Sequence, residues 1–341
     1  MTAAALLADG RSAAARVDVS AVVVNYNGQA LLRRCLDSLR VALTAVDATN
    51  EIVVIENAST DGSRAMLAAD YSDVRVIASD TNLGFAGASQ LALAEAGGDW
   101  LFFMNNDATA DRRAVALLLA EGRRHADVGA VAAQMRFADR PQIVNSAGLA
   151  IDRLGIAFDI GLGEAVFGQP TAPSEVFGSS AGAALYRREM LEQIGGFDGS
   201  FFMYLEDVDV AWRARARGWR TLQVPAAIVL HEHSRSAGHR SDFKYFHVGR
   251  NRVRLLAKNA TTKHLARYWP LIVAYDVAYV AYALVVDRST APLRGRLRGL
   301  REWRRYRAAG SPQRPVELVP ARGLRAALGR NAAVGPMREA R

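Results

Sequence analysis

The chain has 341 residues, of which 50% are hydrophobic and 23% are charged, a balance that supports a sizeable buried core and excludes a largely disordered protein. Its single cysteine, Cys35, excludes an intrachain disulfide and a cysteine-based metal cluster. The net charge of +9 belongs to the C-terminal end, because residues 288–341 hold fourteen Arg against three Glu (+11), which leaves −2 for the first 287 residues.

Residues 1–16, MTAAALLADGRSAAAR, contain only a brief apolar run, which is too short for the hydrophobic region of a secretory signal. We therefore expect a flexible tail on a protein of the reducing cytoplasm.

The next stretch, VDVSAVVVNYNG (17–28), predicts a buried strand that ends in Asn-Tyr-Asn-Gly. One face of the helix predicted after it carries Leu31, Leu32, Cys35, Leu36 and Leu39.

The alternation of apolar strand and amphipathic helix continues to residue 137. The further predicted strands are EIVVIEN (51–57), VRVIASD (74–80), WLFFM (100–104) and VGAVAAQMRF (128–137). Because these strands lack polar alternation, they predict an α/β fold with a doubly wound, mostly parallel sheet covered by helices on both faces. After residue 140 the elements are shorter and richer in glycine, which predicts a smaller mixed region.

Polar residues follow the predicted strands at their carboxyl ends. They are Asn25, Tyr26, Asn27, Glu56, Asn57, Asp80, Asn82, Asn105, Asn106 and Asp107. Taken singly, each is explained as a loop residue. Because ligands bind beyond the carboxyl ends of the strands in an open parallel sheet, the set together predicts a binding pocket.

Asp107 has two interpretations, a helix N-cap or a metal ligand. Asp111 directly precedes the periodic run RRAVALLL and is better placed to cap that helix. A carboxylate at the sheet edge suits Mg²⁺, which is often held by one or two carboxylates plus substrate phosphates. Because the chain lacks both GxxxxGK[ST] and GxGxxG, we expect this metal to neutralise a nucleotide diphosphate.

A second acidic group lies in YLEDVDVAWR, which contains Glu206, Asp207 and Asp209. Carboxylates in the first turn of a helix are favoured by the helix dipole alone. Alternatively, one of them takes a proton from an attacking hydroxyl group. Helical spacing groups Glu206 with Asp209 and points Asp207 elsewhere. His231 ends an apolar run, and its spacing alone favours a structural histidine over a metal ligand.

Seven segments stand in the order found in bacterial family 2 glycosyltransferases, and together they resemble that family. They are VVVNYNG, VIENASTDGS, NLGFAGAS, FFMNNDA, SSAGAALYRREMLEQIGGFD, FFMYLEDVDVAWRARARGW and VPAAIVLHEHS. Within the family, the chain most resembles the rhamnosyltransferase branch. The resemblance implies the GT-A fold and inversion at the anomeric carbon of the transferred sugar.

The resemblance also implies roles for individual residues. The nucleotide-sugar site would contain Tyr26, Asn27, Glu56, Asn57, Asp61, Asn82, Gly84 and Asn106. Asp107 would hold Mg²⁺ or Mn²⁺ on the donor diphosphate, and His231 would complete the metal site. Asp207 would be the catalytic base, with Glu206 beside it. The acceptor site would contain Gly182, Ala183, Trp212, Arg250 and Arg252.

Two positions depart from the family pattern. The motif here is Asn-Asn-Asp instead of Asp-x-Asp, so a single carboxylate must hold the metal, and Glu56 stands where the family more often has Asp. The implied reaction transfers L-rhamnose from dTDP-L-rhamnose to GlcNAc on a polyprenyl diphosphate, in the synthesis of an arabinogalactan-type cell-wall linker. The cation would stabilise the charge on the leaving phosphate oxygens.

The C-terminal region is first apolar and then rich in arginine. LIVAYDVAYVAYALVV (271–286) includes Asp276 and is shorter than the ~20 residues of a typical spanning helix. It predicts either a docking helix or an interfacial helix. In the second case, anionic headgroups would meet Arg294, Arg296, Arg298, Arg301, Arg304, Arg305 and Arg307. Because a polyprenyl acceptor lies at the bilayer, we favour peripheral attachment to the inner face of the plasma membrane, with no nucleic acid as partner.

These observations predict five regions: a tail (1–16), a nucleotide-sugar half (17–140), an acceptor and catalytic half (141–260), membrane-proximal helices (261–310) and a basic tail (311–341).

The first alternative function is transfer of another UDP- or dTDP-linked sugar. A sugar nucleotidyltransferase would need a Gly/Lys-rich phosphate loop, which NYNGQALLRR does not offer. The acids at 107 and 207 disfavour a catalytically silent scaffold.

Overall fold

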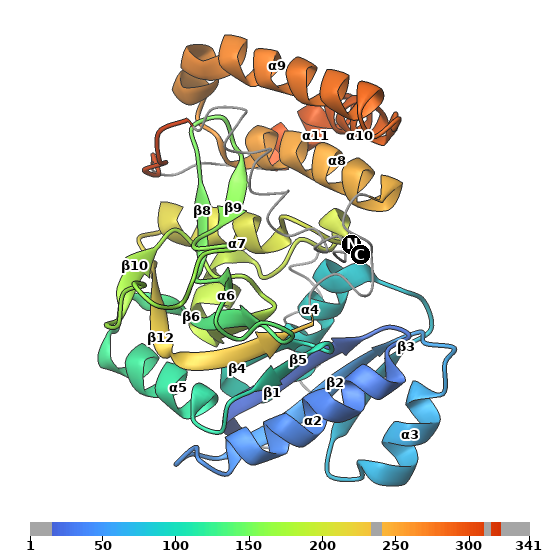
Figure 1. The fold of residues 1–341 in the computed structure, drawn as a ribbon, viewed down its shortest axis with the longest axis vertical. Coiled ribbons are helices and arrows are strands. Elements are labelled where there is room, and N and C mark those ends of the chain that lie inside the picture. The colour runs from blue at the N-terminus through green and yellow to red at the C-terminus, as the bar shows by residue number, and fades with distance from the viewer. Residues whose placement is uncertain (1–15, 233–240, 310–314, 322–341) are drawn as a thin grey trace, which may run out of the picture.

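A twisted sheet runs through the centre of the molecule in the computed structural model, which describes residues 16–232, 241–309 and 315–321 (Figure 1). Within these residues the sheet has ten strands, in the order β10-β12-β6-β11-β4-β1-β2-β3, with β5 beside β12 and β7 beside β6. Their bounds are β1 Val17–Asn25, β2 Asn50–Asn57, β3 Arg75–Ser79, β4 Gly98–Asn105, β5 Ala108–Ala110, β6 Val128–Phe137, β7 Val144–Ser146, β10 Ser174–Val176, β11 Ala183–Arg187 and β12 Arg220–His231. A separate hairpin contains β8 (Leu149–Ile151) and β9 (Ala157–Asp159).

The direction of the strands confirms the predicted doubly wound, mostly parallel α/β fold. Strands β3, β2, β1 and β4 are parallel, and β12 is parallel to β6. Between these two groups, β11 is antiparallel to both β4 and β6. The single sheet therefore draws its strands from both predicted halves of the chain.

Helices cover both faces of the sheet and bury two apolar clusters. Their bounds are α2 Gln29–Leu43, α3 Ser63–Asp70, α4 Gly84–Glu95, α5 Ala114–Arg124, α6 Arg188–Ile194 and α7 Glu206–Ala216, with a short 3₁₀ helix η1 at Gly199–Phe201. One cluster packs α2, α3 and α5 against the sheet, and the other packs α4, α6 and α7 against it. In α2, Leu32, Cys35, Leu36 and Leu39 are buried, which confirms the face predicted from their spacing.

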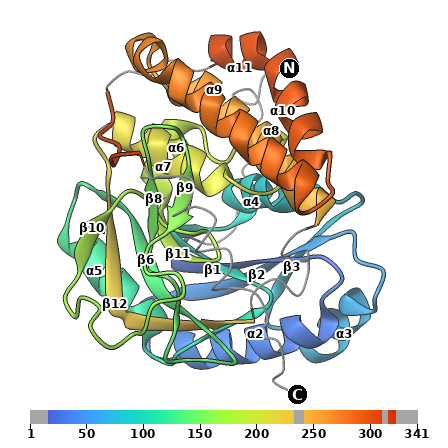
Figure 2. The same ribbon diagram turned by 45° about the horizontal axis from the view of Figure 1, so that its top comes forward.

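The C-terminal helices form a unit that packs beyond α7 (Figures 1 and 2). They are α8 Asp242–Asn259, α9 Thr262–Val285, α10 Ala291–Arg301 and α11 Trp303–Ala309. A third apolar cluster joins this unit to the β8–β9 hairpin and to α7. The first 15 residues and most of the predicted basic tail lie outside the described part of the chain.

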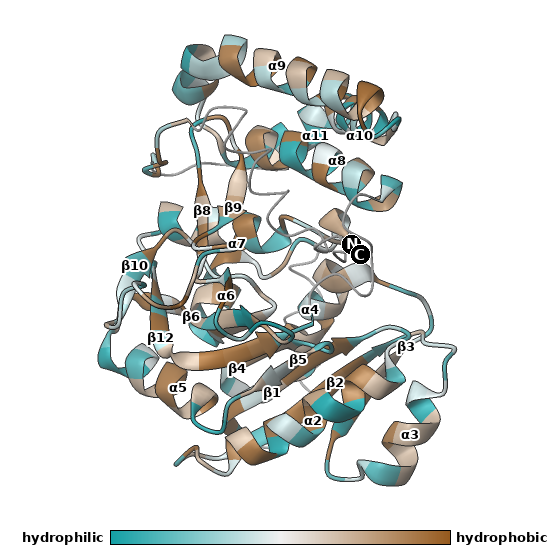
Figure 3. Ribbon diagram, viewed as in Figure 1, coloured by the Kyte–Doolittle hydropathy of each residue, from teal (hydrophilic) through white to brown (hydrophobic). Residues whose placement is uncertain are grey.

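Helix α9 is longer than the apolar stretch predicted from the sequence, because it begins at Thr262 and continues through Pro270. Among the described residues, α9 is the one helix long and apolar enough to cross a membrane. Its most apolar 18-residue stretch has a mean hydropathy of 1.4, and only 6% of that stretch is buried. Apolar colour runs along it in Figure 3. However, Asp276 of α9 pairs with Arg252 of α8 and Arg296 of α10. These ion pairs fix α9 along the protein surface, which favours the docked or interfacial interpretation.

Candidate active site

The donor side of the site lies where β2 and β3 end and α4 begins. The side chain of Asn57, at the end of β2, donates to Asn82 Oδ1 (3.0 Å) and accepts from the Leu83 amide (2.8 Å). Asn82 also accepts from the Gly84 amide (2.8 Å). Gly84 has a φ of +68°, and a Cβ there would lie 2.3 Å from the carbonyl oxygen of Phe202. The position therefore requires glycine, and the two asparagines fix the loop that enters α4.

The loops after β1 and β2 are tied together by polar side chains. Asn27 accepts from the Thr60 amide (2.7 Å), and Asp61 accepts from the Gln29 amide (2.9 Å). The fully buried Glu56 pairs with Arg64 and accepts from the Ser59 amide (2.7 Å). These contacts therefore hold the loops after β1 and β2 together.

Two other rim residues lie at the end of β1 and just after β4. Asn106 donates to Asn25 (2.8 Å), which connects the two strand ends. Tyr26 is 48% exposed, so its ring is accessible for stacking against a nucleobase.

Asp107 and His231 meet although 124 residues separate them. The β5–β12 pairing sets Ala108 opposite His231, and it brings His231 Nε2 to 3.1 Å from Asp107 Oδ1. His231 Nδ1 lies 2.9 Å from Asn145 Oδ1, and Asn105 Nδ2 lies 3.3 Å from Nε2. A hydrogen bond at the second ring nitrogen, as with Asn145 here, fixes the tautomer and the orientation of a histidine that binds a metal. These contacts are compatible with both interpretations of His231, a structural histidine and a metal ligand.

This pair fits a divalent cation that is only partly coordinated by protein. Within the described residues, no group of three or more His, Cys, Asp or Glu side chains is arranged to hold a metal. One carboxylate and one imidazole leave the remaining positions of the ion to phosphate oxygens and water, which is usual for a cation on a nucleotide diphosphate. The prediction that Asp111 caps α5 is wrong, because Arg113 is the N-cap residue and no side chain caps the helix. Asp111 accepts from the Arg113 amide (3.0 Å) in the turn before α5.

The three acids at the start of α7 have separate environments. Asp207 is half-buried and accepts from the amides of Val208 (2.8 Å) and Ala181 (3.4 Å). Burial, and then the charge of Asp159, raise its pKa to about 6. Burial and the neighbouring Asp207 raise the pKa of Glu206 well above its ordinary value. A general base works best with a pKa near the operating pH, and the pKa of Asp207, at about 6, meets this condition.

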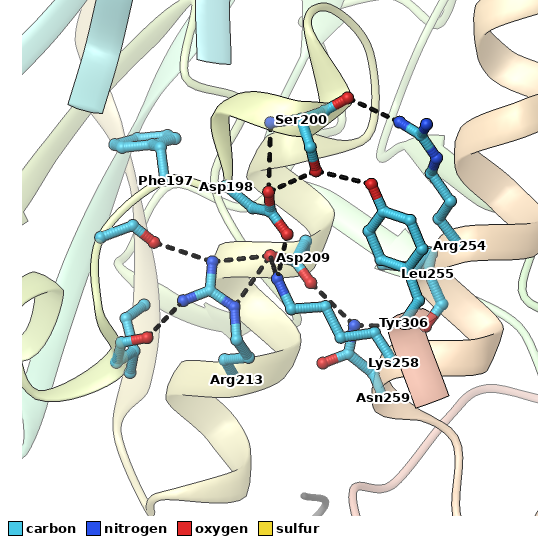
Figure 4. Close-up of polar contacts among 12 residues, drawn as sticks. Phe197, Asp198, Ser200, Asp209, Arg213, Arg254, Leu255, Lys258, Asn259 and Tyr306 are labelled. Atoms are coloured by element: carbon cyan, nitrogen blue, oxygen red, sulfur yellow. Dashed lines mark hydrogen bonds and ion pairs between the residues drawn. The ribbon is translucent and has the colours of Figure 1, made fainter. Parts of the chain in front are cut away.

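Asp209 serves the packing of the helix. Burial opposes its ionisation, but Arg213 and Lys258 outweigh this effect and lower its pKa to about 2. Arg213 and Lys258 donate to Asp209 Oδ2, and Asn259 donates to Asp209 Oδ1 (2.8 Å). Figure 4 shows these contacts between α7 and α8.

Asp159, at the end of β9, is a further candidate site residue that the sequence did not indicate. It is half-buried, and burial raises its pKa while Lys244 and His231 lower it. Its charge also raises the pKa of Asp207. Asp159 thus interacts electrostatically with residues of both the metal pair and the catalytic acids. The alternation Phe158–Asp159–Ile160, within an otherwise irregular region, was the available signal.

The predicted acceptor residues divide into two groups. Gly182 and Ala183 lie beside the end of β4, where the Asn105 amide donates to the Gly182 carbonyl (3.0 Å). The neighbouring amide of Ala181 contacts Asp207, so this segment borders the catalytic acid.

The other acceptor candidates lie in packed surroundings. Trp212 is buried and packs its ring edge-on against Phe177. Arg252 is also buried, and it bonds Asp276 and the carbonyl of Leu154 (2.5 Å). These contacts correct the expectation that both side chains face the acceptor. Arg250 is half-buried and donates to the carbonyl of Phe201 (2.8 Å).

Residues 20–195 match the family described as Glycosyl transferase family 2, which covers about half of the chain. The chain belongs to this family and is a glycosyltransferase. It is 29% identical over 240 residues to the N-acetylglucosaminyl-diphospho-decaprenol L-rhamnosyltransferase of Mycobacterium tuberculosis, a match covering 64% of this chain and 76% of that protein.

Solved structures show the same fold at low sequence identity. The mannosyltransferase PcManGT from Pyrobaculum calidifontis, in complex with GDP-Man and Mn²⁺, has a TM-score of 0.50 and 20% identity, over 97% of this chain and 85% of its own. GalNAc-T7 with UDP, GalNAc and Mn²⁺ has a TM-score of 0.55 and 16% identity, over 71% of this chain and 48% of its own. The GT-A fold expected from the sequence is thereby confirmed.

Proposed function

We propose that this enzyme transfers L-rhamnose from dTDP-L-rhamnose to GlcNAc on a polyprenyl diphosphate, with inversion at the anomeric carbon, in the synthesis of an arabinogalactan-type cell-wall linker. The observation that supports a transferase mechanism most directly is the half-buried Asp207, whose pKa is raised to about 6 and whose charge interacts with Asp159. The choice of sugar and acceptor rests on the similarity to the mycobacterial rhamnosyltransferase.

Asp207 would act as the general base of an in-line displacement. Its carboxylate accepts the proton of the acceptor hydroxyl while the hydroxyl oxygen forms a bond to the anomeric carbon of the donor. The bond between that carbon and the phosphate oxygen breaks, and the nucleoside diphosphate leaves with the electron pair. Burial and the charge of Asp207 raise the pKa of Glu206, which favours the neutral form of that acid beside the base.

Donor binding is assigned to the side chains along the ends of β1 to β4. Tyr26 would stack against the base, and the loops fixed by Asn27, Glu56 and Asp61 would surround the nucleoside. The Asn57–Asn82 pair, Gly84 and Asn106 would close the site around the diphosphate.

Asp107 and His231 would hold the cation, Mg²⁺ or Mn²⁺. When bound there, the cation would supply Lewis-acid stabilisation of the leaving diphosphate. Two structural neighbours contain Mn²⁺, which supports a divalent metal requirement.

Membrane attachment through α9 and α10 would bring the site to a lipid-linked acceptor. Exposed apolar side chains cover the outer side of these helices, among them Trp269, Val273, Val277, Val285, Leu297 and Leu300. Arg301, Arg304 and Arg305 are exposed nearby and suit anionic headgroups. Arg296 and Arg307 do not, because Arg296 pairs with Asp276 and Arg307 bonds the carbonyl of Ala260.

The test is a transfer assay with purified full-length protein, polyprenyl-diphosphate-GlcNAc, Mg²⁺ or Mn²⁺, and a panel of nucleotide sugars. We expect transfer from dTDP-L-rhamnose and an α-linked product. Transfer from a different UDP- or dTDP-linked sugar would refute the substrate assignment while keeping the mechanism. Activity that persists in Asp207→Asn would refute the mechanism.

A further inference from the structure

The loop that leads into the catalytic acids has an unusual backbone. Phe202, Tyr204 and Leu205 have φ values of 66°, 71° and 66°, so three non-glycine residues out of four adopt the left-handed region. Glu206 and Asp207 follow immediately. Side chains with a Cβ disfavour this region, and such backbone persists only where the surroundings enforce it. The backbone of Phe202–Leu205 must therefore be held in place by contacts with neighbouring elements.

One face of α8 provides these contacts. His247, Arg250, Asn251, Arg254 and Lys258 recur at helical spacing and all contact the segment from Asp198 to Asp209. His247 stacks on Phe202, with ring centroids 5.4 Å apart. Arg250 and Arg254 donate to the carbonyls of Phe201 (2.8 Å) and Ser200 (2.6 Å). Lys258 donates to Asp198 (2.7 Å) and Asp209 (3.0 Å), as Figure 4 shows.

Asn251 lies at the centre of this face and is fully buried. Its amide nitrogen lies 2.9, 2.9 and 2.8 Å from the carbonyl oxygens of Phe201, Met203 and Tyr204. The amide oxygen accepts from Arg250 Nε (3.0 Å), which fixes the orientation of the amide group. A carboxamide has two N–H donors, so three converging carbonyls use its full capacity. An apolar or acidic side chain of similar size cannot replace these bonds.

The same loop also reaches the donor side of the site. The Phe202 carbonyl accepts from the Ala86 amide (3.0 Å) in the first turn of α4. The carbonyl is also the group that excludes a Cβ at Gly84. A change in the path of Phe202–Leu205 would therefore displace the base and the donor loop relative to each other.

We propose that Asn251 is a positioning residue, which clamps Phe202–Leu205 and thereby sets the place of the Asp207 carboxylate relative to the donor. The proposal rests on the proposed function of Asp207 as the base. Asn251 itself contacts no reacting atom. Its effect should appear in the rate of the chemical step and in the ionisation of Asp207, with little change in substrate binding.

The test compares Asn251→Leu with Asn259→Leu in the full-length protein. Asn259 is a matched control, because it is a buried asparagine of the same helix whose amide bonds Asp209 and Leu255 and not the loop. We expect Asn251→Leu to lower kcat about 100-fold, the size of effect seen when a reacting group is misplaced by about 1 Å. KM for the donor should stay within about threefold. Asn259→Leu should lower Tm without changing kcat more than about threefold.

The pH profile distinguishes positioning from a general loss of stability. The titratable groups facing Asp207 are Glu206, Asp159 on β9 and Tyr186 on β11, and no substitution in this test alters them. Loosening the loop hydrates the carboxylate, so the acidic limb of kcat should move to lower pH in Asn251→Leu and stay fixed in Asn259→Leu. Asn251→Ser, with one donor left, should give an intermediate shift and provides a second variant if the leucine protein does not fold.

Hydrogen exchange tests the clamp without any substrate. Amides of residues 202–208 should exchange at least about tenfold faster in Asn251→Leu than in the wild type, and those in Asn259→Leu should not. Unchanged exchange in this segment, or an unchanged acidic limb with a normal kcat, would overturn the proposal. If the wild type transfers no sugar, the proposed function fails, and the exchange comparison still decides whether Asn251 clamps the loop.

Discussion

Replacement of Asp207 by asparagine gives the sharpest test of the mechanism. The amides of Val208 and Ala181 donate to different oxygens of Asp207, so asparagine keeps the size of the side chain and one of these two bonds, and it loses the other bond together with the basic oxygen. A positioned general base contributes about 10²–10⁴-fold to a rate, which equals about 3–5 kcal/mol of barrier at 1.36 kcal/mol per tenfold. We therefore expect kcat to fall by at least about 100-fold in Asp207→Asn with the donor KM nearly unchanged.

The pKa of Asp207 adds a signature in pH. With a value of about 6, Asp207 is about nine-tenths ionised at pH 7 and about one-tenth ionised at pH 5. The base must be ionised to act, so wild-type kcat should fall about tenfold for each unit of pH well below 6. Radiolabelled sugar transfer at saturating substrate and fixed metal, from pH 5 to 8, measures both effects.

Glu206→Gln is the matched control for this experiment. Burial raises the pKa of Glu206 and favours its neutral form, and glutamine keeps the size of that side chain, so we expect less than about a tenfold loss. The reasoning would be refuted if Asp207→Asn retained the wild-type rate. It would equally be refuted if Glu206→Gln lost more activity than Asp207→Asn, since the base would then be Glu206.

Four further predictions concern Asp107 of the metal pair, Asp209 of α7 and the C-terminal helices. Asp107→Asn should raise the Mn²⁺ concentration for half-maximal transfer by about tenfold or more, measured by metal titration. Asp276→Asn leaves two buried guanidinium groups without their carboxylate and should lower the free energy of unfolding by about 3 kcal/mol in urea. The pKa of Asp209 is lowered to about 2, so its ionised form stabilises the fold by about 2 kcal/mol above the unfolded pKa near 4, and this stabilisation is lost as the pH falls toward 2. In Asp209→Asn the free energy of unfolding should therefore depend less on pH between 4 and 2, which acid unfolding followed by circular dichroism measures. Joint replacement of Val277 and Val285 by Glu should abolish sedimentation with anionic vesicles, while transfer to a short-chain acceptor stays within about twofold.

The donor rim could be predicted from the sequence because its geometry follows from the fold. Parallel strands end at one edge of a sheet, so residues such as Asn25, Asn57 and Asn106 lie near one another once the strands are identified. The structure adds which of them bond each other, as in the pair Asn25–Asn106. Spacing could not predict that contact, because it depends on the path of each loop.

The other side of the site could be predicted only in part. The acids of α7 formed a visible motif, but Asp159 stands on a three-residue strand whose neighbours have no regular pattern. Its proximity to Asp207 depends on where the β8–β9 hairpin packs. The β5–β12 pairing that joins Asp107 to His231 is equally non-local.

Charge patterns in the C-terminal region were misleading for a related reason. Arg252 was predicted to line the acceptor site, and Arg296 was expected at anionic headgroups if the helix is interfacial, yet both bond Asp276 inside the helical unit. An arginine-rich sequence looks the same whether its guanidinium groups face solvent or a buried carboxylate. The single Asp276 within an apolar helix was the available signal, since a lone carboxylate in such a helix needs a partner.

The C-terminal helices therefore serve the active site as well as any membrane. Arg254, which donates to the Ser200 carbonyl, is itself paired with Glu302 at the end of α10, and Tyr306 of α11 donates to Ser200 Oγ (2.7 Å). A protein truncated near residue 260 would keep Arg254 but would lose its partner Glu302 and the contact from Tyr306, together with α9. Loss of activity after such a truncation would thus not show that membrane contact is required. Only substitutions on the exposed side of α9, such as those at Val277 and Val285, separate the two roles.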